Sequence, residues 1–267
     1  MVWLPRFLHS GSEPPRAGRA RLTLPDDDRV IYAIGDVHGC FDEFLVMEEM
    51  IAADAASLGD RPRMILLLGD MIDRGPRSEA VIEHLLRPPP AGFERMALCG
   101  NHEAAMLAFL ADAEAGWIWM EYGGVETLRS YGIAVPPVVR RGDLRRLATI
   151  ARATVPEAHL AFLRGLPISA QWDGYLFVHA GIRPGIAFAH QDDDDLLFIR
   201  DEFLESTADH GWTVVHGHTP AIEAGRFHGR IGIDTGAYAT GRLSAVRIDR
   251  AGVAFMTATA RNARRSY

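Results

Sequence analysis

Five apolar runs of the sequence each end in side chains that commonly bind metal ions. The motifs at these ends are GDVHG (35–39), GDMIDRG (69–75), GNHE (100–103), HAG (179–181) and HGHT (216–219). Together they supply carboxylates, imidazoles and one amide, with no thiolate among them. This donor set suits Mn²⁺, Fe or Zn²⁺ and differs from the cysteine-rich set of a structural zinc site. The sequence therefore predicts a metal centre assembled from distant segments.

More candidate ligands are present than one ion requires. Two divalent ions that share a bridging carboxylate, about 3.5–4 Å apart, would use the larger set. Asp70 is the natural bridge, because it lies between the motifs around residues 36 and 101 in chain order. Asp73 lies further along and is expected beyond direct coordination. We therefore expect two divalent ions, with Mn²⁺ favoured and Fe or Zn²⁺ as alternatives.

The apolar runs predict the strands that must position these ligands. The segments 29–35, 63–69 and 95–100 are nearly continuous apolar stretches, and each precedes a helical pattern. Such strands are typical of a sheet that is covered on both faces. Ligands of open α/β sheets lie beyond the carboxyl ends of the strands, and glycines there let the backbone turn sharply.

The remainder of the chain divides into a helical part and a second set of strands. Residues 103–166 are almost wholly helical in pattern, which predicts an insertion or cap. Strand patterns then return with few helices between them, which favours a more antiparallel arrangement; they cover residues 174–181, 212–217, 230–234, 241–249 and 252–260. We expect one catalytic domain over 29–258, between a flexible N-terminal arm (1–28) and a basic C-terminal tail (259–267).

Composition excludes several function classes. The chain has 267 residues, a formal net charge of −7 and no lysine, since all 28 basic residues are arginines. An acidic chain argues against general nucleic-acid binding. Without lysine there is neither a Schiff-base lysine nor a Walker-type phosphate loop. Arg6 and His9 interrupt the N-terminal apolar stretch, and no run has the length of a membrane span, so we expect a cytoplasmic protein without membrane partners.

The cysteines offer no alternative chemistry. Cys40 and Cys99 are too few for a disulfide framework and suit a reducing compartment. A cysteine phosphatase needs an arginine shortly after its nucleophile, and the corresponding positions here hold Val46 and Ala105. We expect both cysteines to be small buried residues.

The five motifs resemble the signatures of the calcineurin-like metallophosphoesterases, and most of all those of the phosphoprotein phosphatase (PPP) family. GDMIDRG followed by GNHE is specific, and GHT with LLFIRDEF (196–203) also resembles the bacterial and lambda-phage serine/threonine phosphatases. The likeness extends over about residues 29–250. It implies an α/β (α+β) fold in which two mixed β-sheets pack as a sandwich flanked by helices, with a helical cap insertion.

The resemblance also implies the metal ligands. It assigns two sets that share one carboxylate: Asp36, His38 and Asp70 for the first ion, and Asp70, Asn101, His179 and His218 for the second. Asn101 is also expected to contact the substrate. From the residues alone either histidine of HGHT could be the ligand. In the family pattern His216 is not a ligand. We expect it to support the ligand residues without binding a metal ion itself.

Further residues are assigned to the reaction itself. His102 resembles the family's proton donor, and Asp73 the carboxylate that orients it, since a leaving alkoxide needs a proton opposite an in-line attack by a metal-bridging hydroxide. Arg74 and Arg200 match phosphate clamps, because a guanidinium binds two phosphate oxygens. For Arg200 a surface salt bridge is the alternative. Tyr238 either lines the phosphate pocket or only packs, and glycines 123–124 form a turn or shape the substrate groove.

These roles imply a dinuclear-metal-dependent phosphomonoesterase. A protein serine/threonine phosphatase is the expected activity, with phosphotyrosine as a further candidate substrate. A dinucleoside polyphosphate hydrolase shares the same motifs and is the alternative. An inactive phosphoprotein-binding module is less favoured, because binding alone has no use for a proton donor. The acidic run 192–195 and the net charge favour a phosphoprotein or phosphopeptide over a tetraphosphate.

Overall fold

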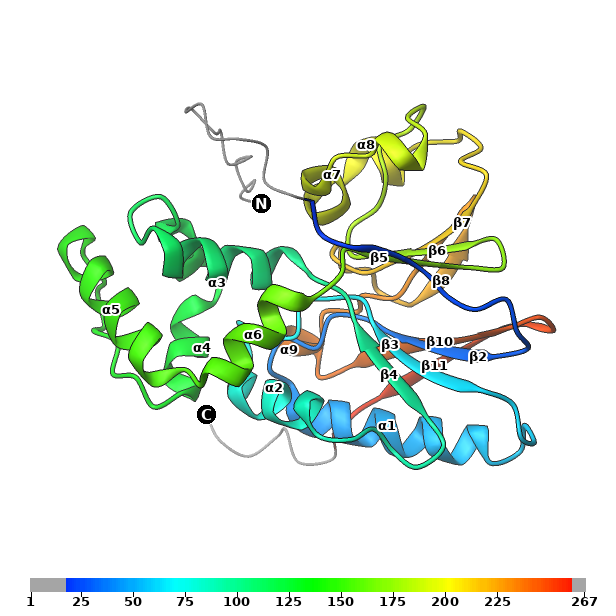
Figure 1. Ribbon diagram of the computed structural model, residues 1–267, viewed down its shortest axis with the longest axis horizontal. Coiled ribbons are helices and arrows are strands. Elements are labelled where there is room, and N and C mark those ends of the chain that lie inside the picture. The colour runs from blue at the N-terminus through cyan, green and yellow to red at the C-terminus, as the bar shows by residue number, and fades with distance from the viewer. Residues whose placement is uncertain (1–17, 261–267) are drawn as a thin grey trace.

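Two mixed β-sheets lie face to face in the computed structural model, which describes residues 18–260 (Figure 1). The five-stranded sheet has the order β11 (Gly252–Ala258), β10 (Leu243–Asp249), β2 (Val30–Ile34), β3 (Arg63–Leu67) and β4 (Glu94–Ala97). The six-stranded sheet has the order β1 (Arg21–Thr23), β5 (Ser169–Trp172), β6 (Tyr175–Val178), β7 (Thr213–His216), β9 (Arg230–Gly232) and β8 (Gly225–Phe227). The expected α/β sandwich is confirmed.

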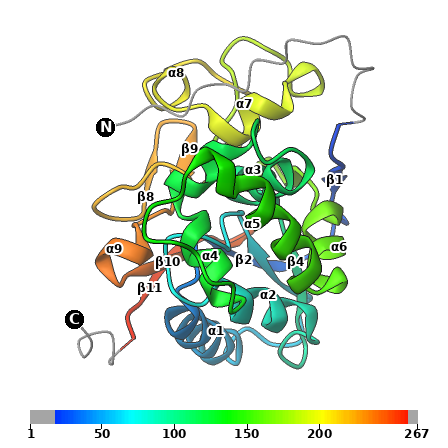
Figure 2. The ribbon, with the colours of Figure 1, turned by 90° about the vertical axis from the view of Figure 1, so that its left-hand side faces the viewer.

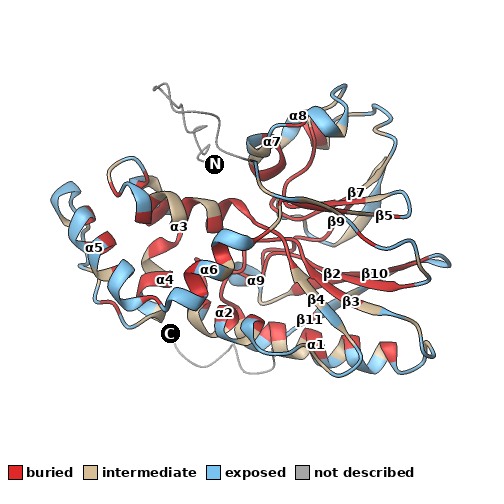
Figure 3. Cartoon of the chain, in the orientation of Figure 1, coloured by how far each residue is buried: buried red, intermediate tan, exposed pale blue. Residues whose placement is uncertain are grey.

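Strand β2 is apolar at every position because both of its faces are covered. Ile31 and Ala33 point into the core between the sheets, whereas Tyr32 and Ile34 pack against the helices. Figure 3 shows the buried residues concentrated in these strands and on the inward faces of the helices. The near-continuous apolar runs of the sequence thus have a direct structural cause.

The pairing of the strands corrects one expectation about the second half of the chain. Strand β10 pairs antiparallel with β2 and β11, as expected, but β7 pairs parallel with both β6 and β9. Parallel neighbours need a long crossover connection. Between β6 and β7 this connection carries the short helices η2 (Phe188–His190), α7 (Asp193–Phe198) and α8 (Asp201–Leu204).

Helices α1 (Phe41–Ala55) and α2 (Ser78–Leu86) follow β2 and β3 and lie on the outer side of the five-stranded sheet (Figure 1). Helix α1 buries Phe44, Met47 and Ile51 against it, at the three- and four-residue spacing of one helix face. The short helix α9 (Ala237–Thr240) precedes β10. Within the described part of the chain, no helix combines the length and apolar character that a bilayer crossing requires.

Helices predominate in the long stretch between β4 and β5, at one end of the two sheets (Figures 1 and 2). They are α3 (Asn101–Ala111), the 3₁₀ helix η1 (Trp117–Tyr122), α4 (Gly124–Ser130), α5 (Arg141–Thr154) and α6 (Glu157–Gly165). Helix α3 packs against η1, α5 and α6, while α4 packs against η1 and α2.

The prediction of a flexible N-terminal arm over residues 1–28 is partly wrong. Arg21–Thr23 forms β1, which pairs parallel with β5. The backbone N–H of Arg19 and the guanidinium of Arg21 both bond the carboxylate of Asp193, at 2.9 and 3.1 Å. A strand of three residues is too short to leave a pattern in the sequence. Residues 1–17 and 261–267, which include most of the arm and most of the expected tail, lie outside the described residues.

Both cysteines are free and buried, which confirms their expected role as packing residues. Burial raises the pKa of the Cys40 thiol to about 12. A thiolate nucleophile is therefore disfavoured at that position at neutral pH.

A buried ion pair joins the five-stranded sheet to helix α1, and its removal tests how this sheet is held to its helices. Arg95 on β4 bonds Glu48 of α1 at 2.9 Å and also donates to three carbonyls at the end of α2, those of His84, Leu85 and Arg87. Arg95→Ala would leave the three carbonyls without this donor and Glu48 with His84, 2.6 Å away, as its remaining partner. We expect it to lower the free energy of unfolding in urea by about 3 kcal/mol.

The matched control is Arg164→Ala. The Arg164–Glu157 pair is exposed, with side-chain exposures of 55% and 75%, so its loss should change stability by less than about 1 kcal/mol. Equal effects of the two substitutions would contradict the structural role assigned to Arg95.

Candidate active site

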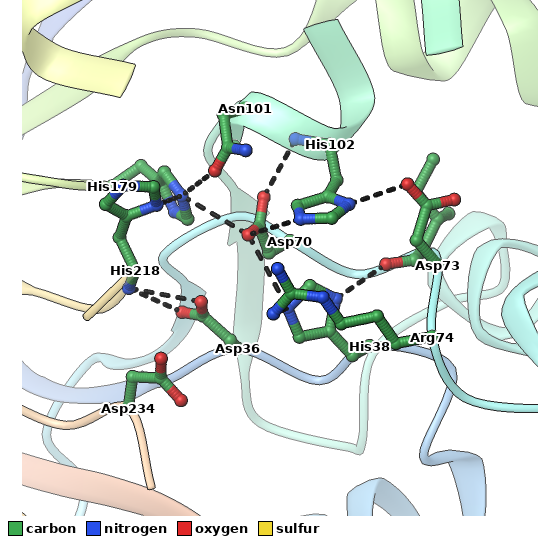
Figure 4. Close-up of polar contacts among 12 residues, drawn as sticks. Asp36, His38, Asp70, Asp73, Arg74, Asn101, His102, His179, His218 and Asp234 are labelled. Atoms are coloured by element: carbon green, nitrogen blue, oxygen red, sulfur yellow. Dashed lines mark hydrogen bonds and ion pairs between the residues drawn. The ribbon is translucent and has the colours of Figure 1, made fainter. Parts of the chain in front are cut away.

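The ends of five strands from both sheets meet at one buried site (Figure 4). Asp36, Asp70 and Asn101 follow β2, β3 and β4, while His179 and His218 follow β6 and β7. Each of these side chains is buried. The two sheets present these ends on the same side, next to the helices of residues 101–165 (Figure 1).

Asp70 occupies the middle of the site. Its Oδ2 atom lies 3.6, 3.7 and 3.4 Å from the Nε2 atoms of His38, His102 and His179, respectively. These separations are longer than hydrogen bonds. Although burial alone would favour the protonated acid, the surrounding imidazoles hold the pKa of Asp70 well below its usual range.

The orientation of two imidazoles is set by backbone carbonyls. His38 Nδ1 lies 2.8 Å from the carbonyl oxygen of Ile72, and His179 Nδ1 lies 2.9 Å from that of Leu68. A carbonyl oxygen only accepts, so each Nδ1 carries a hydrogen and each Nε2 faces the site. This arrangement is common for histidines that bind metals.

Two groups of potential metal ligands can be recognised from the distances. His38, Asp70 and His102 form one group, Asp70, His179 and His218 form the other, and the ligand atoms within each lie within 4.8 Å of one another. Both groups contain Asp70, as expected for a shared carboxylate. Of the two HGHT histidines, only His218 belongs to a group.

The donor set fits divalent cations. Asn101 Oδ1 and His218 Nδ1 lie 2.8 and 3.1 Å from His179 Nε2, so three atoms with lone pairs face one another. Burial opposes a charged ring, but the carboxylate of Asp70 outweighs it and raises the pKa of His179 to about 9. The negative charge around His179 thus favours a positive charge at this point of the site.

Asp36 belongs to neither group, although the resemblance assigns it to the first ion. Both of its oxygens accept the backbone N–H of His218, at 3.1 Å each. Burial, followed by the charge of nearby Asp234, raises the pKa of Asp36 well above its usual range. A cation close to this carboxylate would offset that repulsion.

Asp234 is a site residue that sequence reasoning missed. It is buried beside Asp36 (Figure 4), and it accepts the N–H of Gly236 at 2.8 Å. Burial raises its pKa to about 6. The signal was present, since Asp234 follows a strand in the same way as Asp36 and Asp70.

His102 and Asp73 form a buried pair. Nδ1 of His102 lies 2.7 Å from Oδ2 of Asp73, while the backbone N–H of His102 donates to Asp70 at 3.0 Å. Nε2 of His102 is buried and has no hydrogen-bond partner among residues 18–260. Burial lowers the pKa of His102 to about 4, so the imidazolium expected near neutral pH is not favoured in the chain without substrate.

Two arginines and a tyrosine stand beside this centre. Arg74 Nη1 lies 3.0 Å from His38 Nε2, and Arg200 Nη1 donates to Thr219 at 3.2 Å. Neither guanidinium has a carboxylate partner within ion-pair distance in the described part of the chain, so the alternative of a surface salt bridge for Arg200 finds no support. Tyr238 is 43% exposed and its ring lies 4.7 Å from the Arg74 guanidinium, at the mouth of the site.

His216 points away from the ligands. Its Nδ1 lies 3.1 Å from the carbonyl of Gly217, its Nε2 lies 3.4 Å from Arg230, and its ring meets Phe203 edge-on. Burial lowers the pKa of His216 to about 4, which keeps the ring neutral. The ring supports the turn that carries His218.

Glu103 is a second residue whose role the sequence did not reveal. Its carboxylate accepts the backbone N–H groups of Gly100, Asp70 and Met71 at 2.8, 2.9 and 2.8 Å, and that of Ile72 at 3.3 Å. It thereby joins the turns after β3 and β4. The turns are so close that a Cβ atom on Gly69 would lie 2.5 Å from the nitrogen of Gly100.

This chain belongs to the calcineurin-like phosphoesterase family, whose model matches residues 29–243. The match extends over all five strand-end motifs and over β2 to β9, whereas β1, β11 and most of β10 lie outside it. The sandwich, the shared aspartate and the histidine ligand groups agree with a metallophosphoesterase.

Named relatives differ in their substrates. The chain is 30% identical over 155 residues to the symmetrical bis(5'-nucleosyl)-tetraphosphatase of Aromatoleum aromaticum, a match that covers 58% of this chain but only 45% of that relative. It is 27% identical to serine/threonine-protein phosphatase 1 of Salmonella typhimurium, over 82% of this chain and 92% of that relative. A solved structure provisionally described as a diadenosine tetraphosphatase has a TM-score of 0.60 at 20% identity, and covers 90% of this chain and 98% of its own.

The joint made by Glu103 leads to a prediction for stability. Glu103→Gln places an NH₂ group where two backbone N–H groups now find an acceptor. We expect the free energy of unfolding in urea to fall by about 3 kcal/mol, because buried donors would lose their partners. The rise in melting temperature on adding Mn²⁺ should also shrink, since the turn that carries Asp70 is released.

The exposed Glu121 provides the control, since Glu121→Gln makes the same chemical change at a solvent-exposed position. An unchanged Mn²⁺ response in Glu103→Gln would show that the ligands are held without this carboxylate.

Proposed function

We propose that this metallophosphoesterase is a phosphomonoesterase that uses two divalent ions and acts on phosphoserine or phosphothreonine in proteins. The proposed reaction class rests on one observation. Three imidazole Nε2 atoms surround Asp70, and Arg74 and Arg200 lie beside them. The proposed ions are Mn²⁺, with Fe or Zn²⁺ as alternatives. The proposed setting is the cytoplasm, with a phosphoprotein as partner and neither nucleic acid nor membrane.

The proposed mechanism assigns each side chain a task. Asp70, His38, Asn101, His179 and His218, with Asp36 beside them, would hold the ions. When bound, the ions supply positive charge to the phosphoryl oxygens and lower the pKa of a water nucleophile. Arg74 and Arg200 bind the remaining phosphate oxygens and stabilise the charge that develops on them.

His102 completes the reaction by giving a proton to the leaving oxygen. Asp73 accepts the Nδ1 hydrogen, so the free Nε2 is the atom that faces the site. A bound phosphate dianion would raise the pKa of His102 from its low value and favour protonation at Nε2. The acid is therefore charged when substrate is present, and water restores its proton after each turnover.

The electrostatic argument against a tetraphosphate is weaker than the sequence suggested. In the acidic run, Asp193 pairs with Arg21, and Asp195 is buried against Arg183 at 2.6 Å. At least these two carboxylates of the run are therefore neutralised within the fold. The tetraphosphatase names among the relatives favour a dinucleoside polyphosphate hydrolase as the second candidate.

A different argument supports the protein phosphatase. Arg74 and Arg200 suffice for one phosphate, but a polyphosphate chain needs cations along a longer track. The nearby Arg183 is already committed to Asp195 and Glu202.

The substrate proposal is tested by a direct comparison. One Mn²⁺-loaded preparation is assayed on a phosphoserine peptide, a phosphothreonine peptide and diadenosine tetraphosphate. We expect kcat/KM on the peptides to be at least ~10-fold higher, which corresponds to ~1.4 kcal/mol of transition-state binding. A preference for the dinucleotide would overturn the protein-phosphatase proposal, whereas hydrolysis of neither would overturn the reaction class.

The acid is tested by His102→Asn. An alkoxide leaves poorly and needs the proton, whereas a nitrophenolate leaves unaided. We expect kcat on a phosphoserine peptide to fall ~100-fold or more. The loss of kcat on p-nitrophenyl phosphate should be smaller by a factor of ~10. Equal losses on both substrates would mean that His102 acts on the metals or on phosphate binding.

A further inference from the structure

The carboxylate of Asp73 is held by more than its histidine partner. Trp119 donates its indole N–H to Oδ2 at 2.7 Å, and the Thr127 hydroxyl donates to Oδ1 at 2.5 Å. Trp119, Thr127 and Asp73 are each fully buried. Because both oxygens have fixed donors, the carboxylate can present Oδ2 to His102 in one orientation only.

Helices α4 and α2 also hold the backbone of the GDMIDRG loop. The N–H of Asp73 donates to the hydroxyls of Thr127 and Ser78, each at 2.9 Å. Asp73 and Arg74 both have positive φ angles, 74° and 65°, which are unfavourable for residues other than glycine. Such a conformation persists only where its surroundings enforce it.

The glycine pair 123–124 makes this contact possible. Gly123 has φ 114°, and a Cβ atom there would lie 2.5 Å from the nitrogen of Arg74. A Cβ atom on Gly124 would lie 2.5 Å from the ring of Trp119. The two glycines thus let η1 and α4 reach the loop, with one glycine against Arg74 and the other beneath the indole.

We propose that Trp119 and Thr127 are positioning residues of the acid, which fix the orientation of Asp73 and through it the ring of His102. This inference deepens the proposed function and rests on it, since it assigns the helices between β4 and β5 a part in proton transfer. Hydrogen bonds between buried groups are stronger than those exposed to solvent. Without these donors the carboxylate can rotate, and Nε2 of His102 would no longer be directed at the leaving oxygen.

The test uses Thr127→Val, which removes the hydroxyl at similar volume, and Thr127→Ser, which restores it. Trp119→Phe removes the indole N–H. Its packing control is Phe109→Leu, because Phe109 lies against Trp119 with ring centroids 5.1 Å apart and is not among the hydrogen-bond partners of Asp73. All variants are full-length chains.

The first measurement does not depend on turnover. The ring ¹⁵N and ¹H resonances of His102 are recorded in the Zn²⁺-loaded chain and assigned by their absence in His102→Asn. We expect a protected Nδ1 proton in the parent chain, in Thr127→Ser and in Phe109→Leu. In Thr127→Val and Trp119→Phe that proton should exchange at least ~10-fold faster with solvent, because its acceptor is no longer fixed. Unchanged exchange in both would overturn the inference.

The second measurement is the dependence of kcat on the leaving group in the Mn²⁺-loaded chain. Thr127→Val should lower turnover of the phosphoserine peptide ~10-fold or more and that of p-nitrophenyl phosphate by less than ~3-fold, since only the former needs the proton. Equal losses on both substrates, with Thr127→Ser no better than Thr127→Val, would show a purely structural role. Absence of turnover in the parent chain would instead overturn the proposed function, and the resonances would still decide the positioning of His102.

Discussion

The buried carboxylate of Glu103 accepts backbone N–H groups from two strand ends, and the placement of the central ligands depends on this joint. It fixes the turn that carries Asp70 against the turn that carries Asn101. The turn after β3 presents three N–H groups and the turn after β4 presents one, and this one carboxylate accepts all four. Such an arrangement gives the rigid support that precise ligand positions require. Asp70 can therefore face three imidazoles without moving toward any of them.

The site concentrates unfavourable features that the sandwich must support. Within residues 18–260, six non-glycine residues have positive φ angles, and all except Asp173 belong to the strand-end motifs: His38, Asp70, Asp73, Arg74 and His218. Each such residue costs on the order of 1–3 kcal/mol. The repulsion between Asp36 and Asp234 adds to this cost. Cations would relieve the repulsion, so metal binding and stability are coupled in this fold.

The helices between β4 and β5 are joined to the chemistry through side chains of different elements. Asp73 receives hydrogen bonds from η1 and α4, and α3 carries both His102 and Glu103. The strand ends thus position the proposed metal ligands, while the helical segments carry His102, the proposed acid, and the groups that hold Asp73. Tyr238, which precedes β10, covers Arg74 from the remaining side. Both halves of the chain are therefore needed to complete one site.

Sequence reasoning succeeded where the chemistry follows directly from a strand end. The apolar runs of β2 and β3 could be recognised because burial on both faces removes the polar alternation. It missed contacts that depend on tertiary packing, such as Thr127 with Asp73, because a threonine within a helical pattern gives no sign of its partner. The three-residue strand β1 and the pairing of Asp193 with Arg21 were missed for the same reason. Asp234 could have been found, since it follows a strand.

The central claim is that Asp70 is shared by two divalent ions, and electron paramagnetic resonance of the Mn²⁺-loaded chain tests it most directly. Spectra are recorded as Mn²⁺ is added until binding is complete. The structure predicts that a spectrum of two magnetically coupled ions appears at saturation and is absent in Asp70→Asn. Saturation with only the hyperfine pattern of isolated Mn²⁺ would contradict the shared ligand and the two-metal site built around it.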